Sequence, residues 1–146
     1  MTSLRPRTCP SAGAKLCTYC RWFSRPGPVS EPYFELPLSS RNMRRLFRFR
    51  LSAHSLPIEV GRRLKGNNNT PVPRFARTCP LCPGRHVGDE RHLVFECPAF
   101  AHIRRQHAQI YRNSQSTMRL FMWHPDQKGV ASCLLRLLSE YDSVSG

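Results

Sequence analysis

The chain has 146 residues, and its 23 lysines and arginines against nine acidic residues give a formal net charge of +14. This length allows one domain with a modest core, or a small domain with flexible flanks. The charge favours a polyanionic partner such as nucleic acid over a merely basic soluble surface. No apolar run reaches the roughly eighteen residues of a membrane span, and the first residues lack the apolar segment of a signal peptide. We therefore expect an intracellular protein, nuclear or cytoplasmic, that does not enter a membrane.

Residues 1–38 are expected to form an irregular, proline-rich flank. The stretch RPGPVSEPYFELPLSS contains four prolines, which interrupt helices and central strands. The flank also holds three cysteines without an obvious fourth ligand, which we interpret as unpaired thiols rather than a second zinc site: Cys9, Cys17 and Cys20. Trp22 and Phe23 lie beside arginines and could stack on unpaired bases, although partial burial is the preferred interpretation.

A basic amphipathic helix is predicted in RNMRRLFRFRLSAHSL, which begins at Arg41. Its apolar positions fall at helical spacing and should face the core: Met43, Leu46, Phe47 and Leu51. Its arginines take the other side: Arg41, Arg44, Arg45 and Arg48. After Pro57, IEVGRR is short and is expected to be a strand or an extended connector. LKGNNNTPVPRF should be a loop because it is rich in asparagine and proline.

Two further helices are predicted after Cys97. Pro98 suits a first helical turn, and the next helix should bury one face: Phe100, Ile103, His107 and Ile110. The last helix follows Pro125 and Asp126. Its apolar stripe should lie in the core together with Cys133: Val130, Leu134, Leu137, Leu138 and Tyr141.

The stretch CPLCPGRHVGDERHLVFEC has the pattern of a metal site. Cys79 and Cys82 have the Cys-x2-Cys spacing that allows one tight turn to direct both sulfurs at one ion, and His92 and Cys97 complete four ligands. This Cys3His set suits tetrahedral structural zinc and leaves no position for a catalytic water. In an intracellular protein such a pair is more often a metal or redox site than a disulfide.

Alternatives at this site stay open. One alternative has His86 in place of His92 as the fourth ligand, and another interprets the cysteines as small buried apolar residues. Asp89 and Glu90 are both plausible partners for the second imidazole nitrogen of His92. His54, at the end of the first helix, is interpreted as structural rather than functional.

Two ordered blocks carry a resemblance. RFRLSAHSLPIEVGRR and RTCPLCPGRHVGDERHLVFECPAF resemble the region after the polymerase domain, including its zinc-binding segment, in non-LTR retrotransposon reverse-transcriptase proteins. The resemblance runs from about Arg41 to Phe100 and more loosely to Tyr141. It implies that Cys79, Cys82, His92 and Cys97 bind zinc and that the region contacts template RNA or target DNA. The asparagine run at 67–69 and the first forty residues depart from it.

Catalytic motifs are absent from the chain. It has no Asp-Asp pair of a two-metal polymerase, no His-x-Glu with Pro-Cys-x-x-Cys, no His-Glu-x-x-His and no Gly-Lys-Ser or Gly-Lys-Thr loop. We therefore expect a non-catalytic chain, either a detached fragment of a retroelement protein or a gene model built over one.

The sequence thus predicts a small α-rich domain organised around one structural zinc knuckle. The flank spans residues 1–38 and the zinc-binding region residues 39–142, with the knuckle at 79–97. The expected function is nucleic-acid binding, to RNA or DNA, through phosphate contacts from six arginines: Arg44, Arg45, Arg48, Arg50, Arg62 and Arg63. The alternatives are a zinc-stapled protein-interaction module, with a retroelement protein as a conceivable partner, or a non-functional remnant.

Overall fold

A computed structural model describes residues 32–64 and 68–145, and the regular secondary structure in this range is helical apart from one isolated β-bridge. The helices are α1 (Ser40–Arg50), α2 (Pro57–Arg63), α3 (Ala101–Gln106), α4 (Ala108–Ser114), α5 (Met118–Met122) and α6 (Gln127–Ser145). A π-helical turn covers His92–Glu96, and single 3₁₀ turns cover Pro32–Glu35, Arg74–Ala76 and Pro98–Phe100. The prediction of an α-rich fold is confirmed. The predictions for Cys9, Cys17, Cys20, Trp22 and Phe23 concern residues outside the described range.

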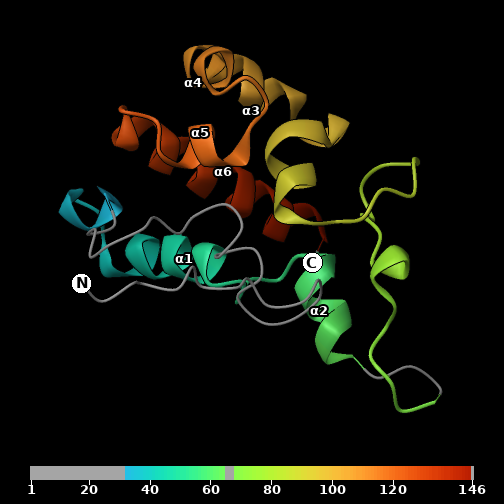
Figure 1. Ribbon diagram of the computed structural model, residues 1–146. Helices are drawn as coiled ribbons and strands as arrows, with labels where there is room; N and C mark the ends of the chain where they lie inside the picture. The colour runs from blue at the N-terminus through green and yellow to red at the C-terminus, as the bar shows by residue number, and fades with distance from the viewer. Residues whose placement is uncertain (1–31, 65–67, 146) are drawn as a thin grey trace, which may run out of the picture.

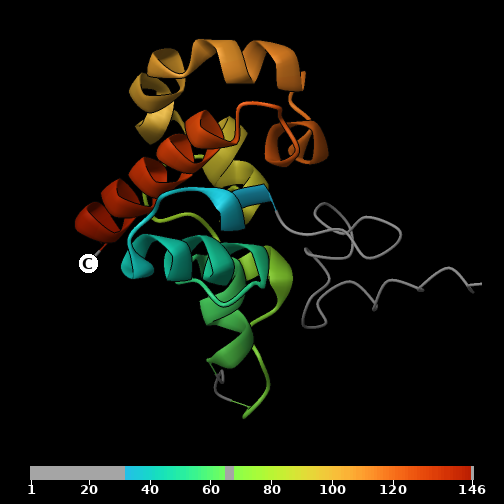
Figure 2. The same cartoon turned by 90° about the vertical axis from the view of Figure 1, so that its left-hand side faces the viewer.

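Helix α6 is the centre of the fold. Figures 1 and 2 show it between α1 on one side and the α3–α4 pair on the other. Its predicted apolar stripe is buried throughout, with Cys133 and Leu137 fully buried. The stripe forms because these positions repeat at helical spacing over a 19-residue helix. The helix is long enough to contact α1, α3 and α5 along its length. No described helix is both long and apolar enough to cross a membrane.

Helix α1 begins where expected, because the Ser39 hydroxyl accepts a hydrogen bond from the Asn42 amide at 3.2 Å and caps its first turn. Leu46 is buried, and Met43 and Phe47 are half-buried against the core. The prediction for Leu51 is wrong, since this residue is 36% exposed and Phe49 is fully buried in its place. The reason is that α1 ends at Arg50, and the chain turns away at Ser52 with a φ of +54°.

Helix α2 corrects the interpretation of IEVGRR as a strand or connector. Pro57 occupies the first helical position, where its missing N–H costs nothing, and the helix runs to Arg63. Packing against the loop before His92 supports so short a helix, because the Ile58 amide donates to the Gly88 carbonyl at 3.1 Å.

The predicted helix after Cys97 is divided. Phe100, Ile103 and Ile110 are buried as expected, but the chain breaks between α3 and α4 at His107. The His107 ring nitrogen lies 3.1 Å from the Ile103 carbonyl oxygen. In a continuous helix this carbonyl would instead accept a hydrogen bond from a backbone amide. Helix α5 had no counterpart in the sequence-based prediction.

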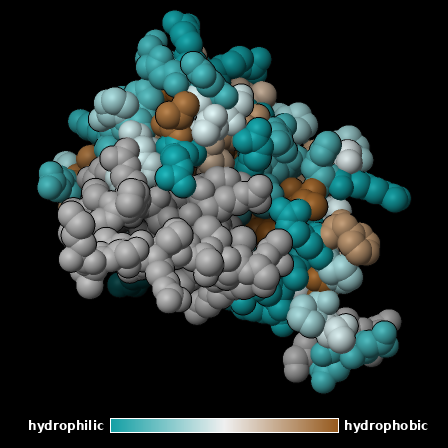
Figure 3. Space-filling view, viewed as in Figure 1, coloured by the Kyte–Doolittle hydropathy of each residue, from teal (hydrophilic) through white to brown (hydrophobic). Residues whose placement is uncertain are grey.

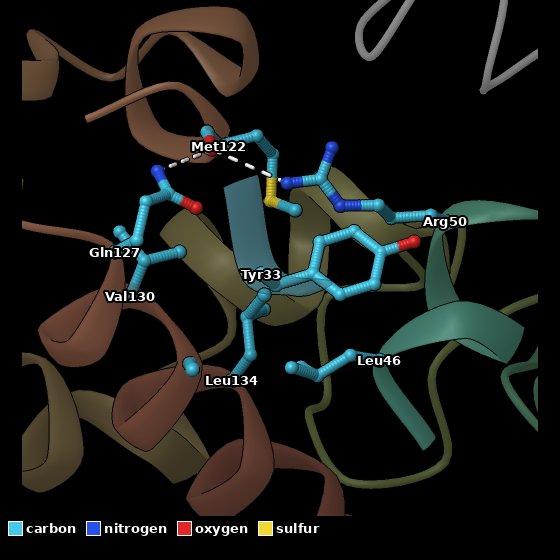
Figure 4. A pocket seen from close by; sticks show the side chains of 8 residues that line it. Tyr33, Leu46, Arg50, Met122, Gln127, Val130 and Leu134 are labelled. Atoms are coloured by element: carbon cyan, nitrogen blue, oxygen red, sulfur yellow. Dashed lines mark hydrogen bonds between the residues drawn. The ribbon is translucent and has the colours of Figure 1, made fainter. Parts of the chain in front are cut away.

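The boundary of the flank at residue 38 also shifts, because Pro32–Glu35 packs on α6 and Tyr33 is only 3% exposed. Figure 4 shows the Arg50 guanidinium over the Tyr33 ring, 4.6 Å from its centroid, and beside the Met122 carbonyl. Gln127 donates to the same carbonyl at 3.0 Å. The described unit therefore includes residues before 39.

Candidate metal centre

The sequence-predicted ligands converge in the structure. The sulfurs of Cys79, Cys82 and Cys97 and a ring nitrogen of His92 all lie within 4.8 Å of one another, so the group could hold one metal ion. The Cys79 and Cys97 sulfurs are 3.9 Å apart, and the Cys82 sulfur is 3.4 Å from His92 Nε2. Cys79, His92 and Cys97 are buried and Cys82 is half-buried, so water has little access to the group.

A short hairpin presents the first two cysteines. Thr78 and Val87 form an antiparallel bridge, the Cys79 amide donates to the His86 carbonyl at 2.8 Å, and the Gly88 amide donates to the Arg77 carbonyl at 2.8 Å. These bonds close the loop that contains the Cys-x2-Cys turn. A Cβ at Gly88 would lie 2.6 Å from Pro57 Cγ, so glycine at this position lets the hairpin pack against α2.

A π-helical turn presents the other two ligands. The Cys97 amide donates to the His92 carbonyl at 2.7 Å, a bond that spans five residues and places both side chains at the same cluster. The first amide of this turn, that of His92, donates to Asp89 Oδ1 at 2.8 Å. Asp89 therefore caps the turn through the His92 backbone amide. The expectation that Asp89 could bind the second imidazole nitrogen of His92 is corrected.

Glu90 is not the imidazole partner either, since it contacts His54 and Ser52. The carboxylate nearest to His92 Nδ1 is Glu96, at 3.5 Å, although no hydrogen bond forms and Nδ1 is a buried nitrogen without a partner in the described structure. Burial lowers the pKa of His92, and the nearby Glu96 opposes this shift. A neutral ring with its proton on Nδ1, toward Glu96, leaves Nε2 as a free donor for a metal. Glu96 was missed, although its spacing of four residues from His92 on a helical turn was a usable signal.

The buried Cys79 sulfur favours the protonated state when no metal is bound. Burial is the main cause that raises the pKa of the Cys79 thiol to about 12; the backbone of Leu81 opposes this shift, and the adjacent Cys97 and Cys82 sulfurs contribute to it. Three sulfurs and one neutral imidazole form a soft set of metal ligands, which suits a divalent metal such as zinc. His86, the alternative ligand, is exposed and stacks on the His92 ring at 5.4 Å rather than joining the cluster.

A buried polar cluster connects the hairpin to α1 and α2. Glu90 is 1% exposed and accepts from His54 Nε2 at 2.8 Å, with the Ser52 hydroxyl at 3.5 Å. His54 Nδ1 accepts from the Leu56 amide at 3.3 Å, which fixes the proton on Nε2. The structural interpretation of His54 agrees with this position. Arg77 adds a second connection, since it donates to the Ile58 carbonyl at 2.9 Å.

The six predicted phosphate-binding arginines occupy different environments. Arg50 is 2% exposed and holds Tyr33, so the prediction that it contacts phosphate is wrong. Arg62 donates twice to Glu59, and Arg45 bonds Asp142 and Ser139. The exposed members are Arg44, Arg48 and Arg63.

Comparisons of the chain with protein-family models, with curated proteins and with solved structures give no match. The chemistry of the site therefore rests on its own residues, a largely buried Cys3His cluster that could hold a metal.

Proposed function

We propose that the metal is zinc and that its role is structural. A tetrahedral zinc with bonds of about 2.3 Å to sulfur and 2.0–2.1 Å to nitrogen places two sulfurs about 3.8 Å apart and sulfur and nitrogen about 3.6 Å apart. The separations of 3.9 Å between Cys79 and Cys97 and 3.4 Å between Cys82 and His92 lie close to these values. The agreement of these two separations, together with the convergence of all four donor atoms within 4.8 Å of one another, is the observation that carries the zinc assignment. With four protein ligands the ion has no open position, which supports a non-catalytic role.

We further propose that the zinc-stabilised unit binds nucleic acid through α1. Arg41, Arg44 and Arg48 share one face of the helix and are all exposed, and none of them makes an ion pair with another described residue. A row of arginines spaced along one helix can contact successive phosphates, which gives affinity without reading the base sequence. The resemblance to the post-polymerase region of retroelement proteins supports the same function, with template RNA or target DNA as the substrate class.

The alternative function, a protein-interaction module, is less well supported because the apolar surface that it needs on α6 is buried. It required the apolar stripes of the last helices to be available to a partner, but the stripe of α6 is buried inside the chain. Figure 3 shows mainly hydrophilic residues on the visible described surface, with apolar residues in small separate patches. The exposed apolar side chains come from different elements, such as Phe75 and Leu120.

The function is tested by salt titrations of duplex DNA and single-stranded RNA binding to the zinc-loaded protein. Replacing Arg44 and Arg48 with glutamine should reduce the slope of log affinity against log salt by about 1.8 on duplex DNA, at about 0.9 per contact. The matched control replaces Arg105 and Arg112, exposed arginines of α3 and α4 that lie beyond α6 from α1 (Figure 1). This control removes the same charge and should leave the slope nearly unchanged. Equal effects of the two double variants would contradict the assignment to α1.

A further inference from the structure

A cavity of about 270 Å³ opens between α1, the turn after it, α2 and the end of α6. Three arginines from two helices line it: Arg45, Arg48 and Arg63. One carboxylate, Asp142, also lines it, so the walls carry more positive than negative charge. Such an excess inside a concave surface concentrates the field on an anion that enters it.

Arg45 and Arg63 are positioned by hydrogen bonds that leave some of their donors available. Arg63 donates through Nη2 to the His54 carbonyl at 3.2 Å and through Nε to the Glu59 carbonyl at 3.5 Å, and both acceptors are uncharged. Its positive charge is therefore not neutralised by these contacts. Arg48 is exposed and forms no ion pair with any described residue. The guanidinium of Arg63 is therefore pre-organised for a tetrahedral oxyanion, and the exposed guanidinium of Arg48 is available to the same anion.

Asp142 already occupies the position of such an anion. Its Oδ2 accepts from Arg45 at 3.2 Å and its Oδ1 accepts from the Ser55 hydroxyl at 3.0 Å, so one carboxylate bridges α1 and the turn before α2. The residue lies in the last turn of α6, where the helix dipole disfavours negative charge. Its side chain is 54% exposed and can turn away from the cavity.

We propose that this cavity binds one phosphate group of a nucleic-acid strand, which exchanges with the Asp142 carboxylate for Arg45 while Arg48 and Arg63 contact its other oxygens. The inference rests on the proposed nucleic-acid function and names a site for it. A recessed cavity of this size accepts a single phosphate and its sugar more readily than the convex surface of a duplex. The phosphate comes either from within the strand or from its end, because both carry the same tetrahedral oxyanion.

The test measures binding of a single-stranded oligonucleotide, with and without a 5′-phosphate, to the zinc-loaded protein. Asp142→Asn should raise the affinity about two- to five-fold, the range for a partly exposed ion pair. Glu140→Gln is the matched control, because it removes the same charge two residues away on α6 from a side chain outside the cavity. Arg63→Gln should weaken binding and reduce the salt slope by about 0.7 on a single strand, whereas Arg105→Gln should not.

The outcomes separate this site from the general function. A preference for the 5′-phosphorylated strand that is lost in Arg63→Gln places a strand end in the cavity, and equal affinities with the same Arg63 dependence place an internal phosphate there. If the wild-type protein binds but Asp142→Asn behaves like Glu140→Gln and Arg63→Gln like Arg105→Gln, the cavity proposal is overturned and the α1 proposal stands. If the wild-type protein binds no nucleic acid, both are overturned.

Discussion

The Cys82→Ser substitution isolates the contribution of the metal to stability. Cys82 is half-buried, so serine at this position disturbs packing little and should by itself cost less than about 1 kcal/mol. The same change removes one of four ligands and should abolish stoichiometric zinc binding. Because the ligands come together only in the folded chain, zinc binding free energy is folding free energy.

The expected loss can be estimated from linkage. With free zinc at about 1,000 times its dissociation constant, the metal stabilises the folded state by about 4 kcal/mol. A domain of this size shifts its Tm by about 4 °C per kcal/mol, so Cys82→Ser should melt roughly 15 °C below the zinc-loaded wild type. Metal analysis of the purified protein and calorimetry in zinc-buffered solution measure the two quantities.

Cys133→Ser is the matched control for this experiment. Cys133 is fully buried in α6 and lies outside the ligand cluster, with its sulfur 3.5 Å from the Tyr111 hydroxyl. Its substitution should lower the Tm modestly and leave one zinc per chain. With excess chelator, the wild type should melt close to Cys82→Ser. A Cys82→Ser protein that retains full zinc, or a zinc-loaded wild type whose Tm does not respond to chelator, would refute the structural zinc site.

Three further outcomes follow from particular contacts. Without metal, stability should fall below about pH 6.5, because burial lowers the pKa of His92 and the unfolded chain binds its proton first. Stability should also fall above about pH 9, because Cys79 ionises there in the unfolded chain while the pKa of the folded thiol is raised to about 12. Melting chelator-treated protein across this pH range measures the loss of stability at both the acidic and the basic end. Gly88→Ala should cost about 1–3 kcal/mol in denaturant unfolding, since its Cβ would clash with Pro57. Arg50→Met should lower stability by loss of its stacking on the buried Tyr33 ring, yet leave the salt slope of nucleic-acid binding unchanged, because Arg50 is buried.

The sequence predicted the ligand cluster because metal geometry imposes local spacing. A Cys-x2-Cys turn and a histidine five residues before a cysteine can converge with little contribution from the rest of the fold, and in the structure Cys79, Cys82, His92 and Cys97 do so. The helix at α6 was predictable for a similar reason, because its apolar stripe from Val130 to Tyr141 extends over about three turns.

Other features depended on contacts distant in sequence. Helix α2 is too short to be stable alone and forms because Gly88 and Arg77 hold its backbone from the hairpin. Arg50 lies about half a turn around α1 from Arg41, on the side of Leu46, so helical periodicity places it toward the core. Nothing in the local pattern indicates that the aromatic ring of Tyr33 covers it there. Periodicity assigns a side chain to a helix face but does not reveal which neighbouring element covers that face.

The metal centre and the arginine cavity are connected by Glu90, which lies two residues before His92 and accepts from His54 in the cavity wall. The hairpin also holds α2, which carries Arg63, through the bond from Ile58 to Gly88. Loss of zinc should therefore release Arg63, while Arg44 and Arg48 stay on α1. We expect chelator to reduce the salt slope of single-strand binding by about 0.7, the value for one contact. Arg63→Gln should show no further reduction in chelator, and an additional loss of the same size would show that the zinc site and the cavity act independently.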